Sequence, residues 1–313
     1  MTDIREWTST VGLENELGEV LSGLANACAT IARTLRTAPL AQLSGSAGSL
    51  NVQGEAQKPL DIISNEVFVN ACRELAQISL AVSEEEEDPI PISATGSYAV
   101  VFDPLDGSSN LDVNVTVGSI FSVVSATTPK HILPGGRPQH IAGFASYGPS
   151  TDLTVLAKGR VARFTLDASD TWRLVELDMR LPDRFPEIAI NAARADSWDD
   201  VIRGFVNDAF HGNEIRYNAR WVASLVAETQ RILSRGGLFL YPADSSGRGR
   251  LRLLYEARPI AAIVEAAGGR CSTGFMPILE VNAETLHDRV PLIFGGASQV
   301  EALEAAYRAD KEN

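Results

Sequence analysis

The stretch from residue 141 to residue 176 constrains the fold most, because its side chains alternate between apolar and polar as they do in β-strands. Within it, TDLTVLAKGRVARFTL predicts a hairpin that turns at Lys158 and Gly159. Further strands are predicted upstream at QISLAVS, at Tyr98 to Asp103 and at Val113 to Ala126. The first half of the chain therefore has to accommodate a sheet of several strands.

Helices are predicted on both sides of this strand-rich stretch. Residues 13 to 36 place apolar side chains at spacings of three and four, as in an amphipathic helix, and Ser64 is predicted to cap a second helix that runs to about Ala76. Two prolines in LPDRFPE, residues 181 to 187, indicate a domain boundary, and helical and stranded patterns alternate beyond it. The elements predicted there are helices at 197–210 and 221–234, a strand at GGLFLYPA, a helix at ARPIAAIVEAAGG closed by Gly268, and a strand at VPLIFGG followed by a helix capped by Ser298.

These patterns predict an α/β fold of alternating helix and sheet layers in two domains, residues 1–182 and 183–313. No apolar stretch approaches the roughly 20 residues of a membrane helix, and the opening MTDIREW lacks a basic segment followed by an apolar one. We therefore expect a cytoplasmic protein with no membrane partner. Cys28, Cys72 and Cys271 are far apart and odd in number, which predicts neither a disulfide framework nor a thiolate metal site.

Acidic residues outnumber basic ones by 40 to 27, which gives a net charge of −13. A nucleic-acid surface needs clustered Lys and Arg to neutralise phosphates, so this composition argues against a nucleic-acid partner. If the substrate is anionic, a local positive charge has to offset the carboxylates. A divalent cation is the simplest candidate.

The segment VVFDPLDGSSN, residues 100 to 110, indicates a metal site at the end of a strand. The strand pattern runs out at Asp103, Pro104 turns the chain, and Asp106 returns to the same side. Two carboxylates brought together in this way repel each other unless they are protonated or bind a metal. Hard oxygen ligands with no nearby sulfur suit Mg²⁺ or Mn²⁺.

Phosphate binding is the second property that this segment predicts. Gly107, Ser108 and Ser109 have small side chains, which let backbone N–H groups approach an anion closely. The alternative is an ordinary turn, because Asp, Pro, Gly, Ser and Asn are all common in turns.

Three further acidic features lie elsewhere in the chain. In LAVSEEEEDP a short strand delivers Glu84 and Glu85 at its end, close to Asp103 if the two strands are neighbours; otherwise the glutamates form a solvated surface. Glu256 in YEARP precedes a helix, where it is either a ligand or a residue favoured by the helix N-terminus. The loop GEAQKPLD leads to Asp61 and is either a mobile lid or a plain surface loop.

Several competing catalytic signatures are missing from the sequence. It contains no GxSxG, no GxxxxGK[ST] and no GxGxxG, and its four histidines show no paired spacing for zinc. Two residues, rather than one, separate the aspartates of DPLD, which weakens a mechanism through an aspartyl-phosphate. A water activated by a metal is the better nucleophile.

Seven blocks of the sequence together resemble those of the class I fructose-1,6-bisphosphatases, within the inositol monophosphatase-like, lithium-sensitive phosphatases. The blocks are NVQGEAQKPLDIISNEVF, VSEE, FDPLDGSSN, TVGSIFSV, GGLFLYPA, LRLLYEARPIAAIVEAAGG and PLIFGG, in that order. The resemblance implies the family's layered sugar-phosphatase fold and hydrolysis of fructose 1,6-bisphosphate to fructose 6-phosphate and phosphate. The same chemistry on sedoheptulose 1,7-bisphosphate, alone or as a second substrate, is the alternative, which leaves gluconeogenesis and the Calvin cycle both open.

The resemblance also assigns metal ligands and catalytic residues. The implied ligands are Glu84, Glu85, Asp103, the carbonyl of Leu105, Asp106, Glu256 and, on the loop, Glu55. They would hold roughly two or three Mg²⁺ ions per subunit, with Mn²⁺ as the alternative ion. Asp61 is implied to polarise the attacking water together with Glu85.

The substrate-binding residues implied by the resemblance are Asp106, Gly107, Ser108, Ser109, Asn191, Arg220, Trp221, Tyr241 and Arg250. Trp221 stands where tyrosine is usual and Arg250 where lysine is usual, but an indole N–H can donate to phosphate and a guanidinium can bind it with two bonds. In the family, the residue that matches Arg220 reaches into a neighbouring subunit's site. The resemblance therefore implies a homo-oligomer, usually a homotetramer.

Two other functions are weighed against this one. A monophosphatase of inositol or nucleotide type is disfavoured by the distal-phosphate residues Arg220, Tyr241 and Arg250. A catalytically inactive relative that serves as a binding or regulatory subunit is disfavoured because every acidic position carries a competent residue.

Overall fold

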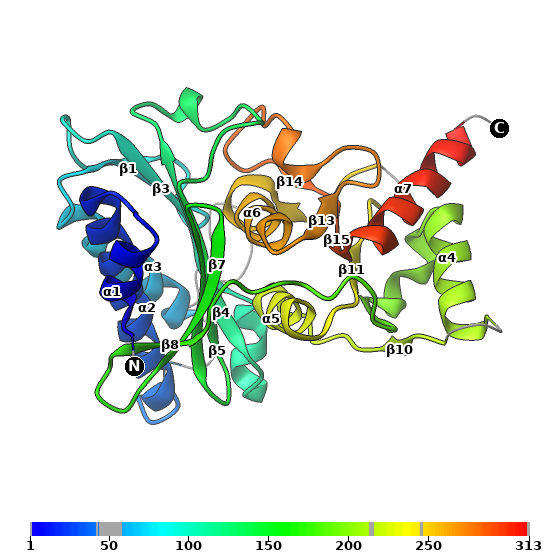
Figure 1. The fold of residues 1–313 in the computed structure, drawn as a ribbon, viewed down its shortest axis with the longest axis horizontal. Coiled ribbons are helices and arrows are strands. Elements are labelled where there is room, and N and C mark those ends of the chain that lie inside the picture. Colours follow the sequence, from blue (N-terminus) through cyan, green and yellow to red (C-terminus); the bar gives the residue numbers. More distant parts are fainter. Residues whose placement is uncertain (1, 42, 44–57, 213–215, 245–246, 312–313) are drawn as a thin grey trace.

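The computed structural model describes residues 2–41, 43, 58–212, 216–244 and 247–311. Within them, layers of helices alternate with two main β-sheets (Figure 1). The predicted α/β fold of alternating layers is confirmed.

In the described part of the chain, the first sheet consists of β1 (Ile78–Ser83), β2 (Ile90–Pro91), β3 (Tyr98–Asp106), β4 (Val117–Ser125), β5 (Ile141–Tyr147), β6 (Thr151–Ala157), β7 (Arg160–Leu166) and β8 (Trp172–Glu176). Their order is β2-β1-β3-β4-β5-β6-β7-β8, and only the neighbours β1 and β3 run parallel. Lys158 and Gly159 turn the chain between β6 and β7 with φ of 51° and 72°, so the predicted hairpin is confirmed.

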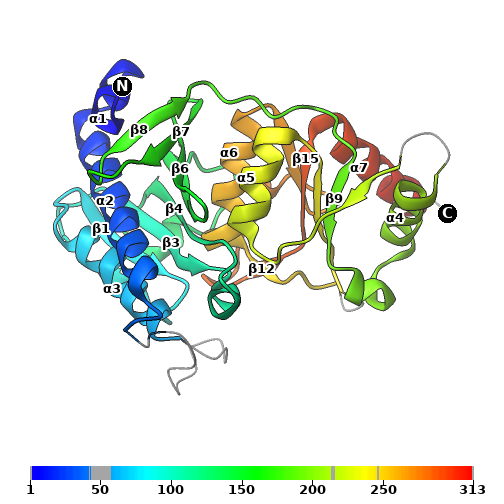
Figure 2. The ribbon, with the colours of Figure 1, turned by 90° about the horizontal axis from the view of Figure 1, so that it is seen from below.

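Helices cover both faces of this sheet. One face packs against α1 (Ile4–Thr10), α2 (Asn15–Thr37) and α3 (Pro59–Arg73), and the other against α5 (Leu225–Arg235) and α6 (Arg258–Ala266) (Figure 2). On β3, Val100 and Phe102 face the first set of helices, and Ala99 and Val101 face the second. A strand buried on both faces has an uninterrupted apolar sequence, as β3 does before Asp103.

The second sheet lies on the far side of α5 and α6. It consists of β9 (Glu187–Ile190), β10 (Asn218–Ala219), β11 (Leu238–Tyr241), β13 (Gly269–Ser272) and β15 (Leu292–Gly296), in the order β10-β9-β11-β15-β13. Its outer face packs against α4 (Asp200–His211) and α7 (Ala297–Lys311), as Figure 1 shows. A separate antiparallel pair joins β12 (Leu251–Arg252) to β14 (Arg289–Val290).

The predicted start of the second helix at Ser64 is wrong. The helix, α3, begins at Pro59, and Ser64 is buried inside it. Proline is favoured in the first turn because it has no N–H to satisfy there. Asp61 accepts a hydrogen bond from the N–H of Lys58 at 2.7 Å and so caps the helix in place of a serine.

The last helix and the strand predicted from Val113 also differ from the prediction. Ser298 lies within α7, and its N–H donates to the carboxylate of Asp183 at 2.9 Å, so the capping group comes from a residue far away in the sequence. The strand begins at Val117, because residues 108–113 form a 3₁₀ helix, η1 (Ser108–Val113). Helix α1 was not predicted.

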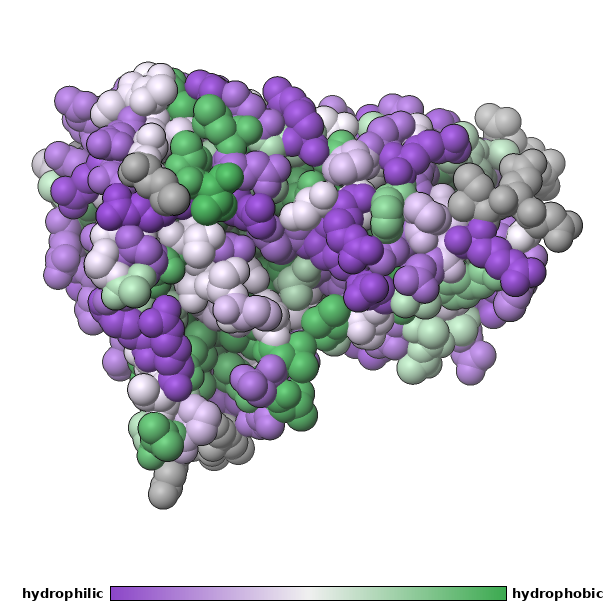
Figure 3. Space-filling view, turned by 60° about the horizontal axis from the view of Figure 1, so that its bottom comes forward, coloured by the Kyte–Doolittle hydropathy of each residue, from purple (hydrophilic) through white to green (hydrophobic). Residues whose placement is uncertain are grey.

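Hydrophilic residues cover most of the face shown in Figure 3, and hydrophobic ones occur there in smaller patches. None of the helices in the described residues has the length and apolar character needed to cross a membrane. Cys28, Cys72 and Cys271 are buried and free, as predicted.

Candidate active site

The ends of β1 and β3 lie together because the two strands are parallel neighbours. Ser83 pairs with Phe102, and the N–H of Glu84 donates to the carbonyl of Phe102 at 3.1 Å. Glu84, directly after β1, and Asp103 in β3 therefore lie at the same end of the two strands, where sheets commonly present functional groups. Glu84 and Glu85 were expected near Asp103 if their two strands are neighbours, and β1 and β3 are neighbours.

An irregularity in β3 brings Asp103 and Asp106 to one place. The register against β4 shifts between these two residues. The N–H of Leu105 donates to Oδ1 of Asp103 at 2.9 Å, and the N–H of Val226, at the start of α5, donates to Oδ2 of Asp106 at 3.1 Å. The strand thus continues to Asp106 instead of ending at Asp103, and Pro104 lies within the irregular part of the strand.

Glu256 joins these two aspartates from the other half of the chain. Among the residues that the structure describes, one carboxylate oxygen from each of Asp103, Asp106 and Glu256 lies within 4.8 Å of the others. Glu256 lies in a π-helical turn, Leu253–Ala257, that leads into α6, and its carboxylate accepts a hydrogen bond from the N–H of Arg252. All three side chains are buried. We call them the carboxylate group below.

Burial raises the pKa of every member of the carboxylate group, and repulsion between charges adds to this for Asp103 and Glu256. Burial is the largest cause for Asp103, whose pKa is also raised by the charges of Glu84, Asp106 and Glu256. Burial raises the pKa of Asp106 to about 6, although backbone N–H donors oppose it, and burial with the charges of Glu84 and Asp106 raises the pKa of Glu256. A divalent cation would replace the protons, so hard carboxylate oxygens in this arrangement fit Mg²⁺ or Mn²⁺.

Arg252 offsets part of the negative charge at the edge of the group. Its Nε lies 3.1 Å from Oε1 of Glu84, and its side chain is only 2% exposed. The ion pair fixes Glu84 close enough to the carboxylate group for its charge to raise the pKa of Asp103 and of Glu256.

Gly118 allows α5 to approach the sheet closely beside the carboxylate group. It pairs with Asp106 across β3 and β4. A Cβ at this position would lie 2.0 Å from the carbonyl oxygen of Ala145 and 2.6 Å from Cγ2 of Val226. Since the N–H of Val226 is hydrogen-bonded to Asp106, the missing side chain permits that bond.

The predicted phosphate loop is tied to the segment before α5. Gly107 is left-handed, with φ of 75°, and residues Ser108 and Ser109 open η1. Within η1, Nδ2 of Asn110 donates to the carbonyls of Val222 and Ala223 at 3.3 and 3.0 Å. The loop that follows Asp106 is therefore held from the C-terminal half of the chain.

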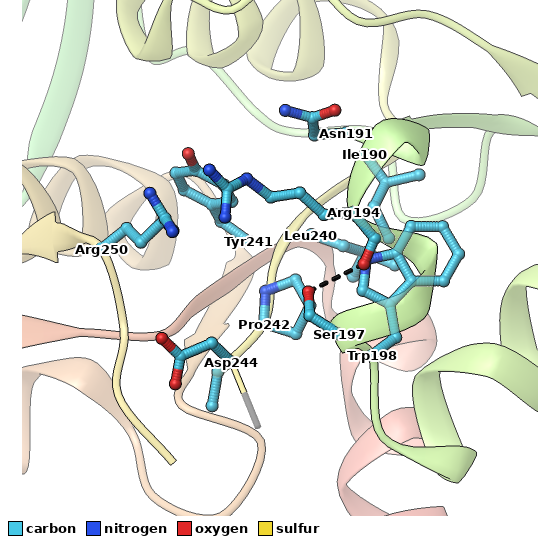
Figure 4. A pocket seen from close by; sticks show the side chains of 11 residues that line it. Ile190, Asn191, Arg194, Ser197, Trp198, Leu240, Tyr241, Pro242, Asp244 and Arg250 are labelled. Atoms are coloured by element: carbon cyan, nitrogen blue, oxygen red, sulfur yellow. Dashed lines mark hydrogen bonds between the residues drawn. The ribbon is translucent and has the colours of Figure 1, made fainter. Parts of the chain in front are cut away.

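A pocket in the C-terminal half brings together three predicted substrate-binding residues, Asn191, Tyr241 and Arg250 (Figure 4). Arg194 and Asp244 line the same pocket and were not predicted. Arg194 follows Asn191 by three positions, which is about one turn of a 3₁₀ helix, so the two side chains could have been expected on the same side of such a turn. The sequence patterns did not predict this turn, which spans Ala192–Ser197.

Arg220 and Trp221 do not line this pocket. Nε of Arg220 lies 3.2 Å from Oε1 of Glu187, and its side chain is 45% exposed. The indole of Trp221 stacks on Phe239 with ring centroids 6.0 Å apart and lies 5.8 Å from Tyr241, so it packs behind the pocket wall.

Both halves of the chain match known families. Residues 4–176 match the model of the fructose-1-6-bisphosphatase N-terminal domain, and residues 181–308 match that of the fructose-1-6-bisphosphatase C-terminal domain. The chain belongs to the fructose-1,6-bisphosphatase family. The predicted family resemblance is thus confirmed, and the chain is a phosphatase enzyme.

Two curated members of the fructose-1,6-bisphosphatase family are each 44% identical to this chain. "Fructose-1,6-bisphosphatase class 1 3" of Methylibium petroleiphilum aligns over 310 residues, 94% of this chain and 87% of that protein. Fructose-1,6-bisphosphatase class 1 of Hydrogenophilus thermoluteolus aligns over 307 residues, 92% of this chain and 86% of that protein.

Solved fructose-1,6-bisphosphatases share the fold. The holo form of the Leishmania major enzyme superposes with a TM-score of 0.94 at 30% identity, over 98% of this chain and 99% of that one. The T-state of the same enzyme superposes with a TM-score of 0.87 at 30% identity, over 98% of both chains.

Among the described residues of the predicted site, Asp61, Glu85 and Leu105 are not members of the carboxylate group. Glu55 lies outside the described residues. Asp61 is buried in the first turn of α3, and the N–H of Glu85 donates to Oγ of Ser83 at 3.2 Å. The N–H of Leu105 binds Asp103. The roles assigned to these four residues remain predictions.

Proposed function

We propose that this phosphatase hydrolyses the 1-phosphate of fructose 1,6-bisphosphate to give fructose 6-phosphate and phosphate, and that it requires Mg²⁺. The observation that carries the proposal is the carboxylate group, because three buried carboxylates at raised pKa are stabilised by a divalent cation. The names of the class 1 relatives support the choice of substrate.

The carboxylate group would hold the metal. Glu84, fixed by Arg252, would join it, as would Glu85, the carbonyl of Leu105 and Glu55, which the family resemblance adds. Bound Mg²⁺ would stabilise charge on the phosphoryl group as a Lewis acid and lower the pKa of a coordinated water.

Asp61, with Glu85, would take the proton of the attacking water. Its side chain is held in place by the N–H of Lys58, which donates to Oδ2 at 2.7 Å. Nζ of Lys58 in turn lies 2.6 Å from Oδ2 of Asp112 in η1. These two contacts connect the proposed base to the proposed phosphate loop, so the two would be positioned together.

The two phosphates would bind at opposite ends of the site. Backbone N–H groups of Gly107, Ser108 and Ser109, next to Asp106, would receive the departing phosphate. Asn191, Tyr241 and Arg250 would bind the distal phosphate and the sugar, with Trp221 supporting Tyr241. Arg220, half exposed on the surface, would contribute to the site of a neighbouring subunit in a homotetramer.

A phosphate-release assay with fructose 1,6-bisphosphate tests the proposal. We expect turnover with Mg²⁺ present, its loss when a chelator removes the metal, and its recovery when Mg²⁺ is restored. Turnover that persists in the chelator, or none with Mg²⁺ or Mn²⁺, would contradict it. Running sedoheptulose 1,7-bisphosphate in parallel and comparing kcat/KM measures the alternative substrate.

A further inference from the structure

The irregularity in β3 is a bulge, in which Pro104 and Leu105 stand opposite the single residue Ser119 of β4. Pro104 has no N–H to donate to the neighbouring strand, and the N–H of Leu105 donates to Asp103. A bulge interrupts the ladder of hydrogen bonds between strands, so other contacts have to fix its backbone. These contacts matter to the site because the bulge lies between Asp103 and Asp106.

The side chain of Ser119 supplies one such contact. Its Oγ donates to the carbonyl of Pro104 at 2.7 Å, and Ser119 is fully buried. Oγ of Ser119 also lies 2.7 Å from the hydroxyl of Tyr147, on β5. A serine hydroxyl carries one hydrogen and a carbonyl can only accept, so Tyr147 donates to Ser119 and Ser119 donates to Pro104.

The surroundings of Tyr147 keep its hydroxyl a donor. Burial, and next the neighbouring thiol of Cys28 on α2, raise the pKa of Tyr147 well above its ordinary value, so the hydroxyl keeps its proton. Both side chains lie on the face of the first sheet that α1, α2 and α3 cover. In such surroundings a hydrogen bond is strong and a carbonyl without a partner is costly. The two hydrogen bonds that lead from Tyr147 to Pro104 therefore favour one conformation of the bulge.

The carboxylate group is thus held from both faces of the sheet. On the side of α5, the N–H of Val226 donates to Oδ2 of Asp106. On the side of α2, Ser119 binds the carbonyl of Pro104, the residue after Asp103. The backbone between the two aspartates sets the distance between their carboxylates, and a metal site binds tightly only when its ligands are held at the right separation.

We propose that Ser119 and Tyr147 are positioning residues for the divalent cation, which they influence through the backbone of the bulge. The inference rests on the proposed function, because it concerns the metal that the carboxylate group would hold. Ser119 fixes the carbonyl of Pro104, and Tyr147 fixes the orientation of the Ser119 hydroxyl. Neither belongs to the carboxylate group, so their loss should act on metal binding without removing a ligand.

Calorimetry with Mg²⁺, in the absence of substrate, tests the role directly. We expect S119A to bind Mg²⁺ ~10-fold or more weakly than wild type, which is the usual cost of losing a residue that orients metal ligands. The Mg²⁺ concentration that half-saturates phosphate release should rise by the same factor. S119T restores the hydroxyl and should recover most of the affinity. Y147F leaves the bond to Pro104 in place and should fall between S119A and wild type.

The matched control is S79A. Oγ of Ser79 also donates to a backbone carbonyl of β3, that of Tyr98 at 2.8 Å, but at the other end of the strand from the carboxylate group. Both serines are buried, so both alanine variants should unfold at a lower temperature than wild type, whereas only S119A should bind Mg²⁺ more weakly. Unchanged Mg²⁺ affinity in S119A, or an equal loss in S79A, would overturn the proposal.

The metal-binding measurement keeps this role distinct from the proposed reaction. If wild type binds Mg²⁺ without hydrolysing fructose 1,6-bisphosphate, and S119A binds it more weakly than S79A, the reaction is wrong and the role of Ser119 stands. If wild type binds neither Mg²⁺ nor Mn²⁺, the role is overturned together with the metal site. Y147F carries the same comparison where S119A does not fold, and an affinity equal to that of wild type would then overturn the proposal.

Discussion

Two sites with buried carboxylates in this molecule, the carboxylate group and Glu187, have opposite electrostatic surroundings. In the carboxylate group, one oxygen from each acidic side chain lies within 4.8 Å of the others, burial raises the pKa of all three members, and acidic neighbours raise those of Asp103 and Glu256 further. Glu187, at the start of β9, is also almost fully buried, but it is surrounded by arginines. At the carboxylate group Arg252 offsets only part of the negative charge, whereas three arginines surround the single carboxylate of Glu187.

The surroundings of Glu187 show a buried carboxylate whose charge is matched by side chains of the chain itself. Its oxygens lie 2.6 Å from Arg231, 3.2 Å from Arg220 and 3.3 Å from Arg235. Burial acts to raise the pKa of Glu187, but the hydrogen bond and charge of Arg231 and the charges of the other two arginines bring it below its ordinary value. The charge of Glu187 is balanced within the chain, whereas we propose that a cation from outside the chain balances the carboxylate group.

The largest expected effect is on turnover in D103N. Loss of residues that merely support a metal ligand typically costs 10–100-fold in activity, so loss of a ligand should cost ~100-fold or more. The same change removes one of several repelling charges, so the metal-free variant should unfold at a higher temperature than the metal-free wild type. Phosphate release and thermal unfolding measure the two effects.

The matched control for D103N is D88N, which removes an exposed aspartate just beyond β1. It should change neither turnover nor thermal stability. Full activity in D103N would remove Asp103 from the proposed metal site, and lower metal-free stability would contradict the repulsion between the carboxylates.

The second expected effect is a loss of stability in E187Q. Removing the negative charge leaves Arg231, whose side chain is 11% exposed, with Glu228 as its remaining carboxylate partner. Breaking a buried ion pair from one side is strongly destabilising, and we expect the free energy of unfolding in urea to fall by about 2 kcal/mol. E66Q, an exposed position on α3, is the control and should match wild type. Equal stability of E187Q and E66Q would show that the arginines do not depend on Glu187.

The smallest expected effect is an opposite pH dependence at the two sites. Folding raises the pKa of Asp106 from 3.8 to about 6, so between these values the metal-free folded state binds more protons than the unfolded state. This contribution to stability is present below pH about 4 and is lost as the pH rises through about 6. The lowered pKa of Glu187 acts in the other direction, with stability present at higher pH and lost in acid.

Mg²⁺ should bind the ionised carboxylates and restore the folding stability that is lost as the pH rises. The stabilisation that Mg²⁺ gives should therefore grow between pH about 4 and about 6, by on the order of 1 kcal/mol, and the growth should be smaller in D103N. Thermal unfolding with and without Mg²⁺ across this range measures it. A Mg²⁺ effect that is independent of pH would contradict the raised pKa values.

Features encoded by short stretches were predicted from the sequence. The alternation of apolar and polar side chains in β5 to β8 and the hairpin at Lys158 and Gly159 depend only on side chains a few positions apart. The same holds for Asp103 and Asp106, because a strand that ends in DPLD brings both carboxylates to one edge. From the residues alone, the sequence therefore located the first two members of the carboxylate group.

Features that depend on contacts between distant segments could not be predicted from local sequence patterns. Asp183 caps α7 from another part of the chain, so the local pattern pointed to Ser298 instead. From local sequence, Glu256 was equally a ligand or a helix-start residue, and only the packing of its turn against β3 places it beside Asp103.

Gly118 lies where two segments pack closely beside the carboxylate group. Its missing side chain leaves room for the carbonyl oxygen of Ala145 in β5 and for the side chain of Val226 at the start of α5, in the C-terminal half. The carboxylate group takes members from both halves, Asp103 and Asp106 from β3 and Glu256 from the turn before α6. A methyl group at residue 118 would displace these two neighbours of Gly118, and with them the N–H of Val226 that is bound to Asp106, so G118A should disturb the carboxylate group without replacing any of its members.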